Sequence, residues 1–459
     1  MNNFSKFKIS MVSSLFFVIF GIFIPVLITL FYRKITISLV LLTFMSLYEV
    51  YKLMRIMISP KIRLLELTYH SFVYLFLVIA PIVQIASGRF PLGGGFLYTE
   101  SEVVSTILVI ATGVVSYELG IKKGAKKVVS EAGTVKLNLM AINVIALFFM
   151  LLAAQKFGGI ANLGVDRSAM DSSVSLIMNS LLRAPIYIAL VLNLIQYKNK
   201  KDKNERVTGL NQVTLGILLI LNFIASNPYY TSRYWFGAIF ISSFLVFLKW
   251  KKTTTSTIVL SAMFGFLVLF PYADVSRSDG EFLLSLEAVL NNLKVGDFDA
   301  FQQIMNTLNY VKVHGYSFGR QLLGAFLFFV PRSVWPNKPL GTGYNIGLDL
   351  NYINKNISAP LWSEFYINFS LIGLIIMFFI YGYITAVMQN EYMSTKGKTN
   401  FYQVFVPFYS FYQFFLLRGD LLSSFSNLIP VVVFTVLFLK LKKKEKSLQR
   451  KNSRKNTRI

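Results

Sequence analysis

The stretch MVSSLFFVIFGIFIPVLITLFY (11–32) decides the fold class, because its 22 residues include no acid, lysine or arginine. A helix needs about 20 mostly apolar residues to cross the hydrocarbon core of a bilayer. A second apolar stretch, 35–54, follows at once, and no small-residue cleavage site separates the two, so the first is not expected to be a signal peptide. The sequence therefore predicts that both stretches cross a membrane.

The composition of the whole chain extends this prediction. Of its 459 residues, 54% are hydrophobic and only 15% are charged, which excludes a disordered chain and argues against a cytosolic globular enzyme. Apolar length predicts an all-α polytopic membrane protein with about twelve spanning helices. The expected spans are 11–32, 35–54, 70–88, 103–121, 136–154, 174–197, 210–226, 233–248, 255–272, 365–388, 401–417 and 422–440.

The formal net charge of +25 indicates topology rather than nucleic-acid binding, because no basic segment accompanies a soluble domain. Basic connections alternate with weakly charged ones, and the positive-inside rule places them, with both termini, in the cytoplasm. These connections are 52–63, 122–127, 198–206, 249–252 and the tail 441–459, which could also touch anionic lipids. The chain has no cysteine and two histidines, so thiol chemistry and histidine-rich metal clusters are excluded.

One connection on the opposite side is far longer than the others. Residues 273–364 form a loop of roughly ninety residues, whereas connections in compact proteins are usually shorter than about 15. We expect a folded extracytoplasmic subdomain here, with the apolar stretch 319–330 lying as a helix near the membrane face. The expected division is a membrane bundle (1–272), this loop subdomain (273–364), further membrane helices (365–440) and the basic tail (441–459).

The densest motif of the loop is PRSVWPNKPLGTG (331–343), in which prolines stiffen the backbone and glycines let it turn. The residues expected to shape it are Pro331, Trp335, Gly341 and Gly343. Arg332 and Lys338 are thereby held on a constrained loop, where a guanidinium suits a phosphate or diphosphate. The alternative is an interfacial anchor, since Trp, Arg and Lys are common at membrane boundaries.

Further cations fall on the outer side, where the positive-inside rule disfavours them. They are Arg320, Arg233, Arg418, Arg167 and, within a span, Arg183. We favour anion binding for the set. The alternative is local pairing, of Arg418 with Asp420 and of Arg167 with Asp166.

The outer side offers five candidates for a general base, Glu364, His314, Asp274, Asp279 and Glu281, and we favour the first two. Glu364 immediately precedes the tenth predicted span, where partial desolvation makes a carboxylate more basic; its alternative role is a salt bridge to an arginine. His314 is the only outer histidine, and its alternative role is that of a surface residue in a turn. The pair Asp297 and Asp299 is expected to open a helix over 299–312 rather than to bind a metal.

Two acids fall inside predicted spans. Glu49 and Glu118 lie near the inner ends of the second and fourth spans, where an acid could couple proton movement in a transporter. We expect instead that they pair with nearby lysines.

The block GRQLLGAFLFFVPRSVWPNKPLGTGYNIG (319–347), with SAPLWSEFYINFSLIG (358–373) and LRGD (417–420), resembles Wzy-type oligosaccharide repeat-unit polymerases of O-antigen and capsular polysaccharides. The order of many helices with one dominant late outer loop is also similar. The family's arginine-x10-glycine pattern fits Arg332 to Gly343. A second copy starting at Arg167 would need glycine where Met178 stands, so that copy is missing.

This resemblance implies a membrane glycosyltransferase of the GT-C kind at the outer face of the bacterial cytoplasmic membrane. It would transfer the growing glycan from undecaprenyl diphosphate to a fresh lipid-linked repeat unit, with no cofactor and no metal. For this reaction we expect the outer cations to bind the diphosphate and Glu364, then His314, to accept the proton. The cations are Arg332, Lys338, Arg320, Arg233, Arg418 and Arg167. A chain-length regulator and a flippase are expected partners. The alternatives are a flippase for the same lipid-linked sugar or an O-antigen ligase.

Overall fold

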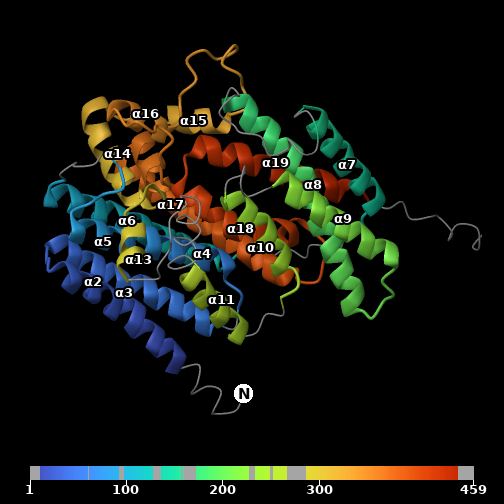
Figure 1. The fold of residues 1–459 in the computed structure, drawn as a ribbon, viewed down its shortest axis with the longest axis horizontal. Coiled ribbons are helices and arrows are strands. Elements are labelled where there is room, and N and C mark those ends of the chain that lie inside the picture. Colours follow the sequence, from blue (N-terminus) through green and yellow to red (C-terminus); the bar gives the residue numbers. More distant parts are fainter. Residues whose placement is uncertain are drawn as a thin grey trace, which may run out of the picture.

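The computed structural model describes residues 11–59, 61–92, 98–127, 136–156, 159, 172–226, 233–248, 252–265 and 286–442. Regular structure in these ranges is helical, apart from one isolated bridge between Leu137 and Lys442 (Figure 1). Seven helices within them are long and apolar enough to cross a membrane. They are Met11–Tyr32, Ile37–Ile58 (α3), Leu64–Ser87, Glu100–Gly124 (α6), Ser180–Asp202 in α8 (Ser172–Asp202), Leu361–Ser394 (α17) and Leu421–Lys440 (α19).

Two of these spans are built from several helical pieces. The first contains a π-helical stretch η1 (Phe17–Phe23) followed by α2 (Ile24–Tyr32). The third consists of α4 (Leu64–Phe72), a π-helical stretch η2 (Val73–Ile79) and α5 (Ala80–Ser87). Most of this third span is buried inside the protein, so it forms the centre of the bundle.

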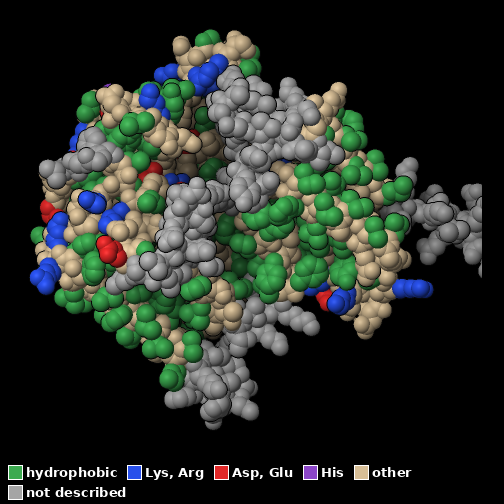
Figure 2. All heavy atoms as spheres, in the orientation of Figure 1, with side chains coloured by type: hydrophobic (Ala, Val, Ile, Leu, Met, Phe, Trp, Pro, Cys, Tyr) green, Lys and Arg blue, Asp and Glu red, His purple; other side chains and the backbone are tan. Residues whose placement is uncertain are grey.

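The remaining predicted spans also contain helices, but as far as the described residues extend these do not reach both the length and the apolarity of a span. They are α7 (Leu139–Lys156), α9 (Gly209–Ala225), α10 (Arg233–Leu245), α11 (Lys252–Phe264) and α18 (Phe401–Arg418). The chain is thus a multi-pass membrane protein, and the predicted number of twelve spans is supported for seven in the described part. Figure 2 shows apolar side chains over much of the surface of the bundle, as expected for helices that face lipid.

Helices α6 and α17 touch backbone to backbone, and glycines make this contact possible. A Cβ atom on Gly120 would lie 2.0 Å from the carbonyl oxygen of Phe379, and one on Gly382 would lie 2.0 Å from that of Tyr117. Gly124, one turn after Gly120, faces Tyr383 in the same way. Small residues spaced by four are a known device for close helix packing in membranes. The sequence contains this signal at 120–124, and our prediction overlooked it.

Helix α17 is interrupted near its start. Phe369 and Ser370 have non-helical backbone angles, and Ser370 has a positive φ of 62°. Asn368, just before the break, accepts hydrogen bonds from the Ser317 hydroxyl (2.9 Å) and the Leu322 amide (3.3 Å) through its side-chain oxygen. The first two turns of α17, which carry Glu364, are therefore held by the long loop as well as by the bundle.

The long loop is described from residue 286 onward and is folded. It contains α13 (Leu286–Asn292), the 3-10 turn η6 (Gly296–Phe298), α14 (Ala300–His314), α15 (Arg320–Phe326) and α16 (Thr342–Asp349). The helix expected over 299–312 is confirmed as α14, and the apolar stretch 319–330 is helical only to Phe326. Helix α14 packs against α6 and α17, and its buried Gln302 exchanges hydrogen bonds with the backbone of Leu92.

The ends of the helices that are joined by basic connections meet at the end of the bundle opposite the long loop. The Gln389 side chain, near the end of α17, donates to the carbonyl of Ile62 and accepts from the amide of Leu65. Asn390 contacts the carbonyl of Ala125, at the end of α6. The charged connections around 61–63 and 122–127 therefore lie together, as the alternation of charge along the sequence predicts.

Candidate functional site

Two carboxylates line one narrow pocket between the loop and the membrane helices, which is packed too closely in this structure to hold a water molecule. Glu364 lies in the first turn of α17, and Asp420 is the residue immediately before α19. The other walls come from Gln321 in α15 and from Pro339 and Thr342 in the second half of the 331–343 motif. The pocket thus joins the loop block and the end of the chain, which lie far apart in the sequence.

Glu364 is the more enclosed of the two acids, with 2% of its surface exposed. Its Oε2 accepts a hydrogen bond from the Thr342 hydroxyl (2.9 Å), and its Oε1 accepts one from the Leu421 amide (3.1 Å). Each oxygen of a carboxylate has room for a further donor. Glu364 is therefore oriented by the starts of α16 and α19 and keeps acceptor capacity. Neither contact is the salt bridge to an arginine considered from the sequence.

Asp420 is held by backbone amides from two helices. Its Oδ1 accepts from Leu422 (2.8 Å) as the N-cap of α19, and its Oδ2 accepts from Gly343 (3.2 Å) at the start of α16. Burial raises the pKa of the Asp420 carboxyl above its usual value, while these amide donors act in the opposite direction. An acid directly before an apolar run is a cap signal, and it could have identified this role from the sequence.

The two glycines of the motif allow this close approach. A Cβ atom on Gly341 would lie 2.3 Å from Oδ2 of Asp420, and one on Gly343 would lie 2.4 Å from the carbonyl oxygen of Ile357. Both distances are shorter than real Cβ contacts. These two positions were expected to shape the loop. The physical reason is that glycine leaves space for the Asp420 carboxylate at position 341 and for the backbone of Ile357 at position 343.

Gly341→Ala should therefore displace the Asp420 carboxylate and destabilise the protein by about 1–3 kcal/mol, the usual effect of overpacking. Thermal unfolding of the purified protein in detergent measures this. Gly216→Ala is the matched control, because a Cβ there meets open space in the middle of α9 and alanine is the better helix former. A Gly341→Ala protein as stable as the parent would contradict this view of the contact.

The three cations expected around the motif do lie together, but they differ in what they offer. Lys338 is only 5% exposed, and its ammonium donates to the carbonyls of Phe328 (2.6 Å) and Val330 (3.0 Å). Burial lowers the pKa of Lys338, and the neighbouring Arg332 lowers it further. Lys338 thus closes its own loop instead of presenting its charge to solvent.

Arg332 and Arg320 remain exposed on the same loop. Arg332 donates to the carbonyls of Lys338 (2.6 Å) and Pro339 (3.4 Å), and Arg320 donates to that of Asn337 (2.8 Å). A guanidinium has five donors, so both retain donors for a ligand. Figure 2 shows Lys and Arg side chains gathered at the top of the molecule, where Figure 1 shows the loop after α15. These guanidinium groups hold the segment 337–339, and the pocket wall begins at Pro339.

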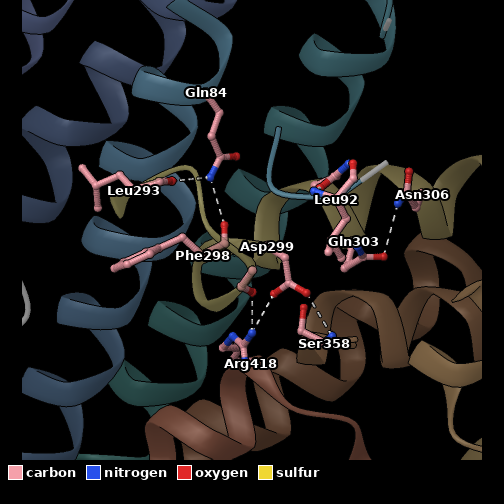
Figure 3. Close-up of polar contacts among 11 residues, drawn as sticks. Gln84, Leu92, Leu293, Phe298, Asp299, Gln303, Asn306, Ser358 and Arg418 are labelled. Carbon is pink, nitrogen blue, oxygen red and sulfur yellow. Dashed lines mark hydrogen bonds and ion pairs between the residues drawn. The ribbon is translucent and has the colours of Figure 1, made fainter. Parts of the chain in front are cut away.

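Arg418 has a different partner from the one weighed in the sequence. Its Nη2 donates to Oδ1 of Asp299 (3.0 Å) and to the carbonyl of Gly296 (2.7 Å), so the proposed pairing with Asp420 is not formed (Figure 3). Asp299 also accepts from the Ser358 amide (3.1 Å). Asp299 does precede α14, but its side chain makes no cap bond there. The Arg418–Asp299 pair therefore fastens the end of α18 to the loop.

His314 lies away from the pocket. Its Nε2 is 2.7 Å from Oδ1 of Asp349, at the end of α16, whereas Thr342, the partner of Glu364, is at the start of that helix. At 1.5 Å per residue these positions are roughly 10 Å apart. His314 and Glu364 are thus not brought together. Trp335 is half-buried and Pro331 is exposed.

Two predicted cations cannot be placed. Arg167 lies outside the described residues, and so does the side chain of Arg233, although its backbone begins α10.

A buried charged cluster was not predicted. His70 lies between two acids, with Nδ1 2.7 Å from Oε2 of Glu49 and Nε2 3.0 Å from Oε1 of Glu118. Lys52 pairs with the other oxygen of Glu118 (2.5 Å). The expected lysine partner is therefore found for Glu118, while the hydrogen-bond partner of Glu49 is His70. The three helices α3, α4 and α6 supply these residues, and no spacing within one of them signals the cluster.

Comparison of the chain with protein-family models, with curated proteins and with solved structures found no match.

Proposed function

We propose that this protein is a Wzy-type polymerase, which joins undecaprenyl-diphosphate-linked oligosaccharide repeat units at the outer face of the bacterial cytoplasmic membrane. The observation that carries the proposal is the pocket in which Glu364 and Asp420 face the loop that bears Arg332 and Arg320. An acid pocket beside exposed guanidinium groups offers what this transfer needs: a proton acceptor and charge for a diphosphate. The multi-pass bundle supplies the membrane setting for a lipid-linked donor.

In this proposal a hydroxyl of the acceptor unit attacks the anomeric carbon of the donor glycan. The new C–O bond forms as the bond from that carbon to the diphosphate oxygen breaks, and undecaprenyl diphosphate leaves with the electron pair. Glu364 accepts the hydroxyl proton, and Asp420 fixes the loop that closes the pocket. Arg332 and Arg320 stabilise the negative charge that grows on the diphosphate, because one guanidinium group can donate two parallel hydrogen bonds to phosphate oxygens.

Arg332→Ala tests the role of the exposed cations. In the native strain, the long-chain ladder of the surface glycan should fall at least tenfold on a gel while single repeat units still reach the surface, since loss of one charge-stabilising donor typically costs 10²–10³ in rate. Membrane protein level is measured alongside, because Arg332 also holds its own loop. Arg332→Lys should recover part of the ladder, because it keeps the charge without the planar fork.

Lys312→Ala is the matched control, an exposed cation of the same loop that bonds only to Asn309 within the described contacts. Its ladder should be unchanged. An unchanged ladder in Arg332→Ala would remove this residue from the site. If deletion of the whole protein trapped repeat units on the cytoplasmic face, the flippase alternative would replace the polymerase.

A further inference from the structure

A second cavity lies at the other end of α17 and α18, away from the carboxylate pocket. Glu364 is in the first turn of α17, whereas Tyr392 in its last turn lines this cavity; Gln403, in the first turn of α18, lines it too. The cavity has a volume of about 90 Å³. A buried water needs roughly 10–15 Å³ by the same measure, so the space exceeds that of a few waters.

The lining of this cavity has an apolar part and a charged part. Its apolar part consists of Ile195, Leu245, Val246 and Pro407. Its charged part consists of Lys198, Lys396 and Lys398, against the single acid Asp202, so the lining carries a net positive charge of two. A free inorganic anion would use only the second part. An amphiphile with an anionic head would use both.

The turn that bears two of the lysines is rigidly held. The Gln403 side chain donates to the carbonyl of Tyr392 and to the hydroxyl of Thr395, which closes the connection between α17 and α18. Asn400 caps α18 by accepting from the Gln403 amide (3.1 Å). The start of an α-helix carries partial positive charge, which adds to that of the lysines. These bonds fix the backbone of the turn that carries Lys396 and Lys398.

We propose that this cavity binds the phosphate of an anionic membrane lipid, with the lysines on the phosphate and the apolar wall against the glycerol and the first carbons of the acyl chains. The site lies at the end of the bundle where the basic connections gather, where anionic headgroups are expected. A bound lipid would bridge α8, α17 and α18. This site is independent of the proposed polymerase activity.

The test compares the full-length protein with Lys396→Gln/Lys398→Gln in detergent. Phosphatidylglycerol, phosphatidylcholine and inorganic phosphate are titrated separately, and the thermal unfolding midpoint is followed, because a ligand that binds the native state raises it. We expect phosphatidylglycerol to raise the midpoint of the parent, and the variant to need roughly 10- to 30-fold more of it, since each lysine near an anionic lipid contributes to binding. Phosphatidylcholine should have little effect on either.

Lys122→Gln/Lys123→Gln removes the same charge from exposed lysines at the end of α6 and should bind as the parent does. Equal effects of phosphatidylglycerol and phosphatidylcholine would overturn the proposal, as would undiminished binding in the Lys396/Lys398 variant. Stabilisation by inorganic phosphate to the same extent as by phosphatidylglycerol would replace the lipid site by a site for a free anion.

Discussion

Glu364→Gln should lower the polymerisation rate by about 10²–10⁴, the usual contribution of a positioned general base. Glutamine has nearly the same shape, so the side chain can still accept from Thr342 or from the Leu421 amide. It has no carboxylate to take the proton of the acceptor hydroxyl. The measurement is formation of polymer by purified protein supplied with its lipid-linked repeat unit, with product lengths read on a gel.

Glu102→Gln is the matched control for this experiment. Glu102 is also a carboxylate at the start of a helix, where it forms a capping box with Thr99 at the beginning of α6, but it does not line the pocket. Its rate should stay within twofold of the parent. If Glu364→Gln kept more than a tenth of the parent rate, Glu364 would not be the base. Glu364 and Asp420 would then have only a structural role, holding the starts of α16 and α19.

His70→Ala should destabilise the protein by about 3–5 kcal/mol, because it leaves a buried charge without its partner. Glu49 is 0% exposed and His70 is 1% exposed. Both ring nitrogens face carboxylate oxygens, whereas a neutral imidazole has only one N–H, so the cluster must hold an imidazolium or a protonated carboxyl. If His70 is an imidazolium, the two positive charges of His70 and Lys52 balance the two negative charges of Glu49 and Glu118. Denaturant or thermal unfolding in detergent measures the loss.

The other histidine supplies the control. His314 pairs with Asp349 at the surface with 42% of its side chain exposed, and exposed pairs contribute only about 0–1 kcal/mol. Its replacement by alanine should be nearly neutral. The combined change His70→Leu/Glu49→Leu should recover most of the stability, because it removes both buried charges. A loss below 1 kcal/mol in His70→Ala would mean that water or another group replaces the imidazole.

The sequence is sufficient to predict a structural feature when that feature depends on residues close together along the chain. Apolar length located helices in all the predicted spans, and the acids at 297–299 marked the start of α14. Apolar length set the start of the tenth predicted span at residue 365, just after Glu364, whereas α17 begins at Leu361 and carries Glu364 in its first turn. Seven of the twelve expected spans are supported by the described helices; α18, for example, is less apolar than a typical span, because it contains Pro407 and many polar and aromatic residues.

Features that depend on how helices are rotated against each other were not predictable. Hydropathy does not say which face of α3 meets which face of α6, so the bridge through His70 was not visible. Nor did charge indicate that Lys338 would turn inward while Arg332 stays exposed, since that depends on the path of a proline-rich turn. Arg418 had an acid two residues away, yet its partner Asp299 is 119 positions away.

The break at Phe369 and Ser370 separates α17 into two parts with independent phase. In a continuous helix, one inserted residue would rotate everything beyond it by about 100°, and Glu364 would lose its alignment with the glycine contact on α6. Here the outer part is bonded to the loop through Asn368, and the inner part packs on α6 through Gly120 and Gly382. The first part is not released from the bundle, because the Trp362 indole donates to the carbonyl of Ile110 on α6 (3.1 Å). The break therefore redirects the first two turns of α17 toward the loop while both parts stay packed on the same neighbouring helix.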